Sequence, residues 1–382
     1  MSTFTAMKTG LLKRYLAIAA IFMCSIISAG AQPEGQLRRI TPDSIRYSHM
    51  GQLVMDKKGN CYASYLQNHG DGGEKLRSSS SEVTLACFRL ERVLADDFSP
   101  LEDVEYHRIG GLGDTFLGNT AASIFKDNSM CMEGDVIHIT FQFLPSTDDI
   151  AHLFKTDYNV RTGTFSGEEE CMISYKGTVE PMTIRAVSRI ITEEGGRAPQ
   201  IEDNILELVS QWSRYRGWWY ATLACAGKTG SNGLVVRTKD FKVMEYVAMP
   251  PFNRDGMAEI SSIIKNGRLY VACRQNYGIF ELLLSCYDLR KGQWGPVTSI
   301  PDGNSRPWFF ARHGRLYLMN TPDKPRRYID ISEIGLEDGT VSVRKIATKQ
   351  DCGFYYATAS HRGRIYMVVT LDTESFGPLD IF

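Results

Sequence analysis

One short segment, a glycine turn followed by aromatic and β-branched residues, recurs along this chain. The later copies are "NGRLYVACRQ" (266–275), "HGRLYLMNTP" (313–322) and "RGRIYMVVTL" (362–371), and the earlier variants are "KGNCYASYL" (58–66), "GDVIHITFQ" (134–142) and "RGWWYATLAC" (216–225). Other apolar segments flank each copy, and the later copies are spaced by roughly 45 to 50 residues, the length of a propeller blade of three or four antiparallel strands. The pattern therefore predicts an all-β fold, a six-bladed β-propeller.

The last blade must close the ring, because a single blade cannot bury both of its faces. After the final repeat the chain has room for one more strand, "PLDIF" (378–382), so we expect a segment within residues 37–45 to complete that sheet. Insertions at 68–81 and 176–203 lengthen the early blades, and a seventh blade concealed in 176–203 is the alternative. No helical periodicity stands out, so we expect one propeller domain over residues 32–382.

The first 31 residues have the pattern of a signal peptide. Lys8, Lys13 and Arg14 precede an apolar run that ends in Ala29-Gly30-Ala31, which fits the small-residue cleavage rule. We therefore expect an exported protein, periplasmic or extracellular, whose mature chain begins near Gln32. No second apolar stretch approaches the length of a membrane span.

Composition excludes some classes of partner. A formal net charge of −1 gives no overall electrostatic footprint for nucleic acid or for an acidic membrane surface, although a local basic pocket remains open. No metal-binding spacing occurs, and we expect no metal, no cofactor and a monomer. Most cysteines lie in apolar strand runs and are interpreted as buried small side chains. The alternative is cross-strand disulfides, such as Cys61 with Cys87 or Cys273 with Cys286.

Loops that lead into the innermost strands of a propeller converge on one end of the central channel, where ligands bind. These loops carry Arg46 and His49, then Glu259, then Arg306, then Tyr355. Several guanidinium groups around one cavity repel each other unless an anion binds them, and a carboxylate suits their geometry. The sequence therefore indicates a site for an acidic ligand, and we expect a glycan or oligosaccharide.

At these residues the chain resembles the sialidases (neuraminidases), which are six-bladed propellers that hydrolyse terminal sialic acids. Glu259 and Arg274, fifteen residues apart, resemble that family's glutamate and second arginine, and Arg306 in "NSRPWFF" resembles the third. Tyr355 in "GFYYATASHRGRIY" resembles the tyrosine nucleophile. Arg46 corresponds to the first arginine, although the family's Arg-Ile-Pro is here Arg46-Tyr47-Ser48.

The resemblance implies a glycoside hydrolase with a covalent intermediate. Asp71 in the loop "NHGDGGE" stands in the place of the acid that protonates the leaving oxygen, and Glu259 would deprotonate the tyrosine. The outer turns "RTKDFKVMEYV" (237–247) and "SCYDLRKGQWGPV" (285–297) resemble degenerate forms of the family's Asp-boxes, and neither keeps the full pattern. An aspartate in such a turn is expected to accept backbone N–H bonds.

Two other functions remain open. One is a uronic-acid lyase or hydrolase that uses His49 with Tyr47 or Tyr355. The other is a non-catalytic glycan-binding propeller whose stacking platforms are Trp218, Trp219 and Trp308.

Each site residue also has a structural interpretation. Arg274 and Arg306 would pair with carboxylates of blade turns, and Tyr355 would be a core aromatic like Tyr356. Asp71 would be an ordinary loop residue.

Overall fold

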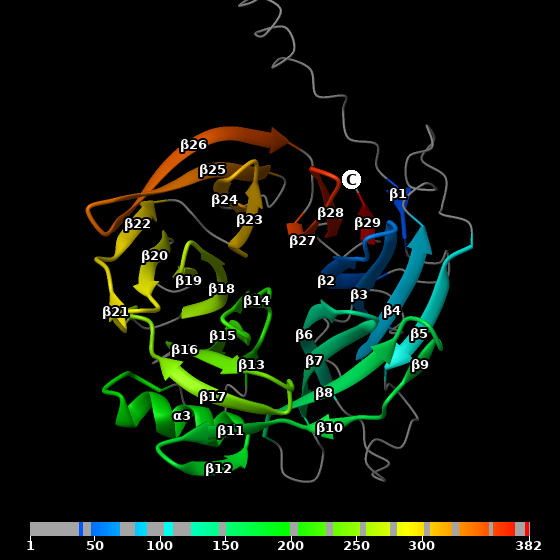
Figure 1. Cartoon of the computed structure of the whole chain (residues 1–382), viewed down its shortest axis with the longest axis horizontal. Coiled ribbons are helices and arrows are strands. Elements are labelled where there is room, and N and C mark those ends of the chain that lie inside the picture. Colours follow the sequence, from blue (N-terminus) through cyan, green and yellow to red (C-terminus); the bar gives the residue numbers. More distant parts are fainter. Residues whose placement is uncertain are drawn as a thin grey trace, which may run out of the picture.

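The strands of the described residues form blades arranged in a ring around one axis (Figure 1). This computed structural model describes residues 38–40, 47–68, 81–89, 103–109, 124–144, 150–198, 205–226, 232–252, 257–275, 281–301, 306–322, 328–350, 354–370 and 379–381. The sheets divide into six blades, which confirms the predicted propeller. The first two blades share one sheet through a single parallel bridge between Ser81 and Ile124.

Each blade begins with an inner strand next to the axis and continues outward by antiparallel pairing. Blade 1 contains β2 (Tyr47–Met55), β3 (Asn60–Asn68), β4 (Ser81–Arg89) and β5 (Glu105–Ile109). Blade 2 contains β6 (Ile124–Glu133), β7 (Val136–Leu144), β8 (His152–Asn159), β9 (Thr164–Phe165) and β10 (Glu169–Glu170). Blade 3 contains β13 (Ile205–Glu207), β14 (Ser213–Tyr215), β15 (Trp218–Ala226), β16 (Asn232–Thr238) and β17 (Val243–Ala248).

The later blades follow the same order. Blade 4 contains β18 (Met257–Lys265), β19 (Arg268–Gln275), β20 (Glu281–Asp288), β21 (Gln293–Trp294) and β22 (Thr298–Pro301). Blade 5 contains β23 (Trp308–Arg312), β24 (Arg315–Asn320), β25 (Tyr328–Glu337) and β26 (Thr340–Gln350). Blade 6 contains β27 (Phe354–His361), β28 (Arg364–Thr370), β29 (Leu379–Ile381) and β1 (Arg38–Arg39).

The ring closes by joining the two ends of the chain. β1 pairs with β29, with Arg38 opposite Ile381 and Arg39 opposite Asp380. An N-terminal segment and the last strand thus share one sheet, as the sequence predicted.

The recurring glycine segment is the turn between the first and second strands of a blade. In blade 4 the turn residues Asn266 and Gly267 have φ of 52° and 75°, and in blade 6 Arg362 and Gly363 have 48° and 77°. Positive φ at both central residues is the type I′ geometry that matches the twist of a two-residue hairpin. The repeat marks this turn because glycine adopts positive φ without steric cost.

The described part of residues 176–203, which ends at Ala198, does not form a seventh blade, and the expectation of no helix is wrong. β11 (Met172–Tyr175) and β12 (Thr178–Pro181) form a hairpin that extends blade 3 through parallel pairing of β11 with β17. Helix α3 (Ile184–Glu193) follows, and the Thr183 hydroxyl caps it by accepting the Ala186 N–H at 3.2 Å. Its apolar face, which includes Ile184, Val187 and Ile190, is buried against the outside of blade 3.

Polar side chains stabilise the outer turns of the blades. Asp240 Oδ1 accepts the backbone N–H groups of Lys242 and Val243 at 2.9 and 3.0 Å, and Asp288 Oδ1 accepts those of Arg290 and Lys291 at 2.9 and 3.1 Å. These bonds confirm the expected role of the two aspartates. In blade 2, Asn159 makes the corresponding bonds to Arg161 and Thr162, a third turn of this type that the sequence analysis did not single out.

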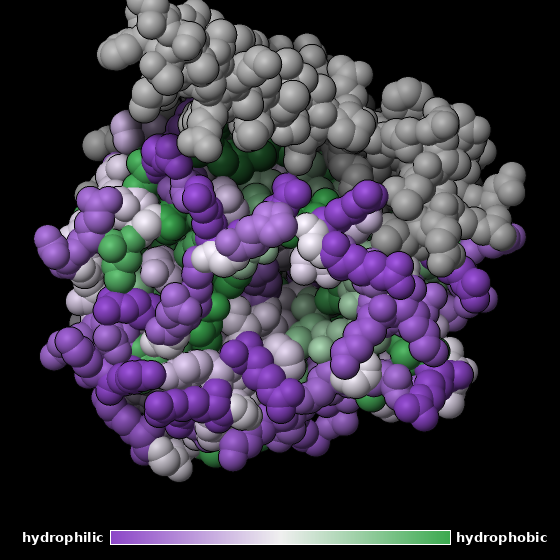
Figure 2. All heavy atoms as spheres, turned by 45° about the horizontal axis from the view of Figure 1, so that its top comes forward, coloured by the Kyte–Doolittle hydropathy of each residue, from purple (hydrophilic) through white to green (hydrophobic). Residues whose placement is uncertain are grey.

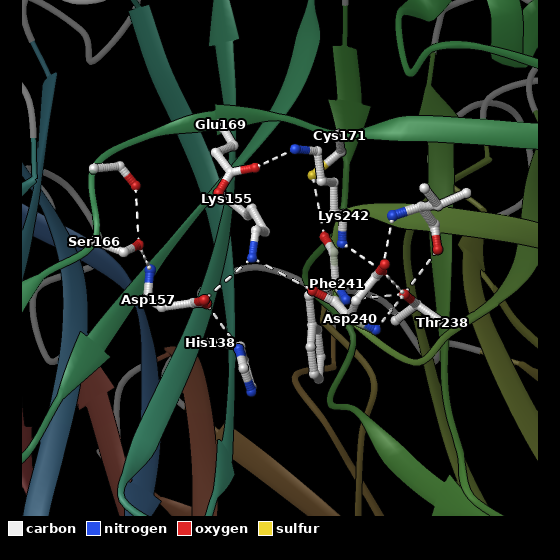
Figure 3. Close-up of polar contacts among 12 residues, drawn as sticks. His138, Lys155, Asp157, Ser166, Glu169, Cys171, Thr238, Asp240, Phe241 and Lys242 are labelled. Atoms are coloured by element: carbon white, nitrogen blue, oxygen red, sulfur yellow. Dashed lines mark hydrogen bonds and ion pairs between the residues drawn. The ribbon is translucent and has the colours of Figure 1, made fainter.

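A polar cluster lies beside the Asp240 turn, between blades 2 and 3 (Figure 3). The Asp157 carboxylate contacts His138 Nδ1 at 2.7 Å and Lys155 Nζ at 3.1 Å, and Lys155 also reaches the Asp240 carbonyl at 3.4 Å. The His138 ring stacks on Phe241 with ring centroids 4.1 Å apart. The cluster therefore joins β7 and β8 to the outer turn of the next blade.

The alternative of cross-strand disulfides is wrong for both proposed pairs. Cys61 lies opposite Phe88 and Cys87 lies opposite Tyr62, so the two thiols point to opposite faces of the sheet. Cys273 and Cys286 are likewise on opposite faces, opposite Leu283 and Tyr270. The seven cysteines of the described residues are free, and all except Cys87 are buried.

Hydrophilic residues prevail on the coloured part of the face seen in Figure 2, and hydrophobic residues together with residues of intermediate hydropathy lie in the hollow at its centre. Across the described ranges, no helix is long and apolar enough to cross a membrane. Within the same part of the chain, no group of three or more His, Cys, Asp or Glu side chains is placed to hold a metal ion.

Candidate functional site

The candidate site lies at the end of the ring where the inner strands begin. Each inner strand is followed by the same antiparallel hairpin, so the starts of all inner strands and the ends of all second strands lie at one end. Glu259 is at the start of β18, and Arg274 is near the end of β19. Arg306 lies two residues before β23, and Tyr356 is near the start of β27.

Glu259 is an extra residue in its strand. Ala258 pairs with Arg274 and Ile260 pairs with Cys273, so Glu259 has no partner across the ladder and forms a bulge. Its φ is 50°, a left-handed conformation that costs a non-glycine residue on the order of 1–3 kcal/mol. Because of the bulge, the Glu259 side chain leaves the strand in a different direction from the one that regular alternation would give it.

Three groups hold Glu259, which is 5 % exposed. Its Oε2 accepts from Arg274 Nη1 at 3.0 Å and from the Arg306 backbone N–H at 2.6 Å. Its own backbone N–H donates to Glu207 Oε2 at 2.9 Å. Charge-assisted hydrogen bonds from several elements offset the cost of burying this carboxylate.

Arg274 and Arg306 are buried as well, at 6 % and 1 % exposed. Arg306 has a φ of 49°, so two strained non-glycine residues meet at one carboxylate. Backbone strain of this kind persists where the surrounding structure enforces it, and it concentrates at functional sites. Arg274 forms its ion pair with Glu259, a residue of β18 rather than of a turn.

Tyr356 completes the described part of the cluster. It is fully buried and packs in the apolar core that contains Trp308, which confirms its interpretation as a core aromatic. Burial raises the pKa of its phenol well above the ordinary value. The Glu259 carboxylate adds to this effect, and the Arg306 guanidinium opposes it.

The other predicted site residues are only partly covered. Arg46 and Asp71 lie outside the described residues. His49 is in β2 and Tyr355 is in β27, where the backbone is described and the side chains are not. The structure thus brings Glu259, Arg274 and Arg306 together, and the assignments of Arg46, Asp71, His49 and Tyr355 stay predictions.

Trp308 is not a stacking platform for a ligand. Its side chain is 2 % exposed, and its indole N–H donates to the Thr358 hydroxyl at 2.9 Å. Trp218 and Trp219 are half-buried, and cations lie over their rings: Arg237 and Lys239 over Trp218, and Arg214 over Trp219.

Sequence reasoning missed Glu207. It occupies blade 3 at the place that Glu259 occupies in blade 4, as "ILEL" (205–208) and "MAEI" (257–260) show. The sequence does contain a signal for Glu207: it is a carboxylate inside an apolar run at the start of an inner strand. Such a charge must have partners when the strand is buried.

Comparison with known proteins identifies solved structures that share this fold. No protein-family model and no curated protein matches the chain. Among solved structures, Trypanosoma rangeli sialidase superposes with a TM-score of 0.58 at 8% identity, over 92% of this chain and 58% of that one. The Hadza microbial sialidase Hz136 gives 0.57 at 11% identity, over 87% of this chain and 65% of that one.

The chain has a sialidase-like propeller fold. A protein of unknown function from Dyadobacter fermentans shares this fold, with a TM-score of 0.58 at 10% identity over 91% of this chain and 99% of that one. This sialidase-like chain spans less than two thirds of the length of the Trypanosoma rangeli enzyme. At these identities the likeness establishes the architecture, and the activity has to be argued from the site.

Proposed function

We propose that this chain is an exported glycoside hydrolase of sialidase type that removes a terminal acidic sugar from a glycan. The observation that carries the proposal is the meeting of Glu259, Arg274 and Arg306 at the strand-start end of a sialidase-like propeller. One of the solved neighbours, the Trypanosoma rangeli sialidase, was crystallised in complex with sialic acid. The order and spacing of the three residues along this chain support the same class of ligand.

In this proposal the arginines recognise the carboxylate of the sugar. Arg274 and Arg306 are buried at the strand-start end of the ring, where a guanidinium–carboxylate bond is strong because water is excluded. Glu259 offsets part of their charge, so Arg46 supplies the additional positive charge that an anionic ligand requires. His49, at the start of blade 1, contacts the substrate on the other side of the channel.

The proposed chemistry has two steps. Tyr355 attacks the anomeric carbon and its phenol proton passes to Glu259, while Asp71 protonates the departing glycosidic oxygen. Water then attacks the glycosyl–tyrosine bond, Asp71 takes a proton from that water, and Glu259 returns the proton to the phenolate. A neutral phenol suits this reaction because a carboxylate nucleophile would be repelled by the carboxylate of the substrate.

Adjacent tyrosines allow a sharp test. The mature chain from Gln32 would be assayed with a fluorogenic sialoside, beside Tyr355→Phe, Tyr356→Phe and Glu259→Gln. Tyr355→Phe is expected to lose roughly a thousandfold or more in kcat, since removing the nucleophile leaves only binding contributions. Tyr317→Phe, in blade 5 and stacked on Phe310, is the matched control and is expected to keep full turnover.

Other outcomes separate the alternatives. If Tyr356→Phe abolishes turnover while Tyr355→Phe keeps it, the nucleophile is wrongly assigned and the reaction class stands. A uronic-acid substrate tests the lyase alternative. If the native protein converts it to products that absorb in the ultraviolet, and His49→Ala does not, the protein is a lyase and the sialidase proposal is wrong. If the native protein binds the sialoside but does not hydrolyse it, the protein is a glycan-binding propeller rather than an enzyme.

A further inference from the structure

The end of the ring opposite the candidate site carries an unusual set of turns. In each blade the turn between the first and second strands lies there, and cations lie in or directly beside this turn in every blade except blade 2. We call the exposed cations at these turns the basic rim: Lys57, Lys58, Arg216, Arg315, Arg362 and Arg364. Blade 4 adds Lys265 and Arg268, which are half-buried.

Type I′ geometry exposes two of these charges. Arg216 and Arg362 each occupy the first central position of such a turn, with φ of 50° and 48°, and a glycine follows. A side chain at the tip of a two-residue turn projects beyond both strands. Arginine is an unfavourable choice for positive φ, so turn formation alone does not explain its use at this position.

The acidic residues of the first turns do not neutralise the rim. Asp56 accepts the backbone N–H groups of Lys58 and Asn60 at 2.8 and 2.9 Å, and so belongs to its own turn. In blade 2, Glu133 pairs with Arg214 at 2.7 Å, and Asp135 pairs with Arg161.

Most of the rim charge faces solvent. Of the basic rim, Arg315 pairs with Glu333 at 3.2 Å. Within the described part of the chain, Lys57, Lys58, Arg362 and Arg364 make no ion pair, and Arg216 lies over the Tyr215 ring. A chain with a formal net charge of −1 therefore gathers exposed cations at one end, where the outer strands and turns also carry the exposed acids Glu105, Glu337 and Asp338.

The arrangement of the rim indicates the shape of its partner. The turns belong to blades set around one axis, so the charges form an arc over blades 3, 4, 5, 6 and 1 rather than a line along one groove (Figure 1). A linear polyanion would meet one sector of this arc, whereas a flat anionic surface meets all of it together. Trp218, beside Arg237 and Lys239 in the blade 3 part of this end, is the amphipathic type of residue found at membrane interfaces.

We propose that the basic rim docks this protein on an anionic lipid surface. Each exposed cation near an anionic lipid surface is attracted to it with a similar free energy. This attraction falls off within a Debye length of the surface and weakens as the salt concentration rises. Docked in this way, the strand-start end with Glu259 and Arg274 faces away from the lipid and toward solvent. This inference does not depend on the proposed enzymatic activity.

Sedimentation with vesicles tests the proposal directly. The mature chain is expected to bind phosphatidylcholine vesicles that contain phosphatidylglycerol, and to remain in solution with phosphatidylcholine alone. Binding is expected to fall steeply between low and physiological salt. Two double variants reverse the rim charge of neighbouring blades: Arg362→Glu with Arg364→Glu in blade 6, and Lys57→Glu with Lys58→Glu in blade 1. Each double variant is expected to reduce vesicle binding at least about tenfold.

A matched control separates local charge from net charge. Arg185→Glu with Arg197→Glu reverses two exposed charges outside the rim, the same change in net charge as in each rim pair, and is expected to leave vesicle binding within about twofold. Thermal unfolding of every variant checks that the fold is kept. If this control pair lost as much binding as the rim pairs, the proposal would be overturned. Tight binding to soluble sulfated polysaccharide with none to anionic vesicles would also overturn it and would assign the rim to a polyanionic chain.

Discussion

The backbone N–H of Glu259 donates to Oε2 of Glu207 at 2.9 Å, so carboxylate residues from the inner strands of neighbouring blades meet at the candidate site. Glu259 has left-handed backbone geometry in a bulge, and its N–H has lost its place in the ladder. Glu207 supplies the missing acceptor. The bond therefore fixes the strained peptide that directs the Glu259 carboxylate to Arg274 and Arg306.

The first prediction concerns Glu207. Glu207→Ala is expected to lower the free energy of unfolding by about 1–3 kcal/mol, because the buried N–H of Glu259 loses its acceptor. Glu207→Gln keeps an amide oxygen in the same place and is expected to recover most of that loss. Urea unfolding measures both variants, with Glu337→Ala, at an exposed position, as the control. Equal stability of Glu207→Ala and wild type would show that this bond does not hold the bulge.

The buried ion pair gives a second prediction. Glu259→Gln and Arg274→Met are each expected to cost about 3–5 kcal/mol, because each leaves one buried charge without its counterpart. The double variant should cost clearly less than the two losses together, since it removes both charges. A double-mutant cycle by urea unfolding measures the coupling. Additive losses, within about 0.5 kcal/mol, would show that the 3.0 Å contact carries little energy.

The cluster between blades 2 and 3 predicts a dependence on pH (Figure 3). Burial alone would raise the pKa of Asp157, but the hydrogen bonds and charges of His138 and Lys155 outweigh burial, and the net pKa lies below its ordinary value. A depressed folded pKa means that the ionised carboxylate stabilises the fold above the unfolded pKa of about 3.9. That contribution is lost as the pH falls below this value, through the folded pKa.

Asp157→Asn is accordingly expected to be less stable than wild type by about 1–3 kcal/mol at neutral pH. The difference should shrink as the pH falls below about 3.9 and through the lower pKa of the folded carboxyl, where the wild-type side chain becomes protonated. Thermal or urea unfolding across this range measures it. Asp338→Asn, at an exposed turn, should show a difference that does not change with pH. If the difference in unfolding free energy between Asp157→Asn and wild type does not change with pH, the charge of the carboxylate is not the cause of that difference.

The cysteines give the fourth prediction. Burial raises the pKa of Cys61, Cys87 and Cys225 to about 12, and that of Cys286 to about 11. Only the thiolate reacts with disulfide reagents, so these cysteines should react slowly in the native protein at pH 8 and rapidly in urea. A reductant should leave the melting temperature unchanged. A large fall in that temperature would show that a disulfide stabilises the protein.

The strands could be predicted because their signals are local. A turn such as Asn266-Gly267, followed by residues that alternate between two faces, needs only the geometry of its own hairpin. Helix α3 was missed although Ile184, Val187 and Ile190 repeat at helical spacing. That segment is an insertion inside an otherwise all-β pattern, and its apolar face is buried against the sheet of blade 3.

The candidate site was predictable only in part. Glu259 and Arg274 belong to one hairpin, so their proximity follows from strand pairing with Ala258 opposite Arg274. The contact of Glu259 with Arg306 joins residues of neighbouring blades, and so does its contact with Glu207. Such contacts depend on how the blades pack around the axis.

The sequence by itself determined the blades, their number and the closure of the ring, because turn chemistry and strand alternation act within short segments. The tertiary structure alone decided which carboxylate meets which arginine and where charge accumulates. Blades repeat along the chain, so positions roughly 50 residues apart come to the same end of the ring. That geometry gathers the turn cations at one end and the buried Glu259–Arg274 pair at the other, a separation that a net charge of −1 conceals.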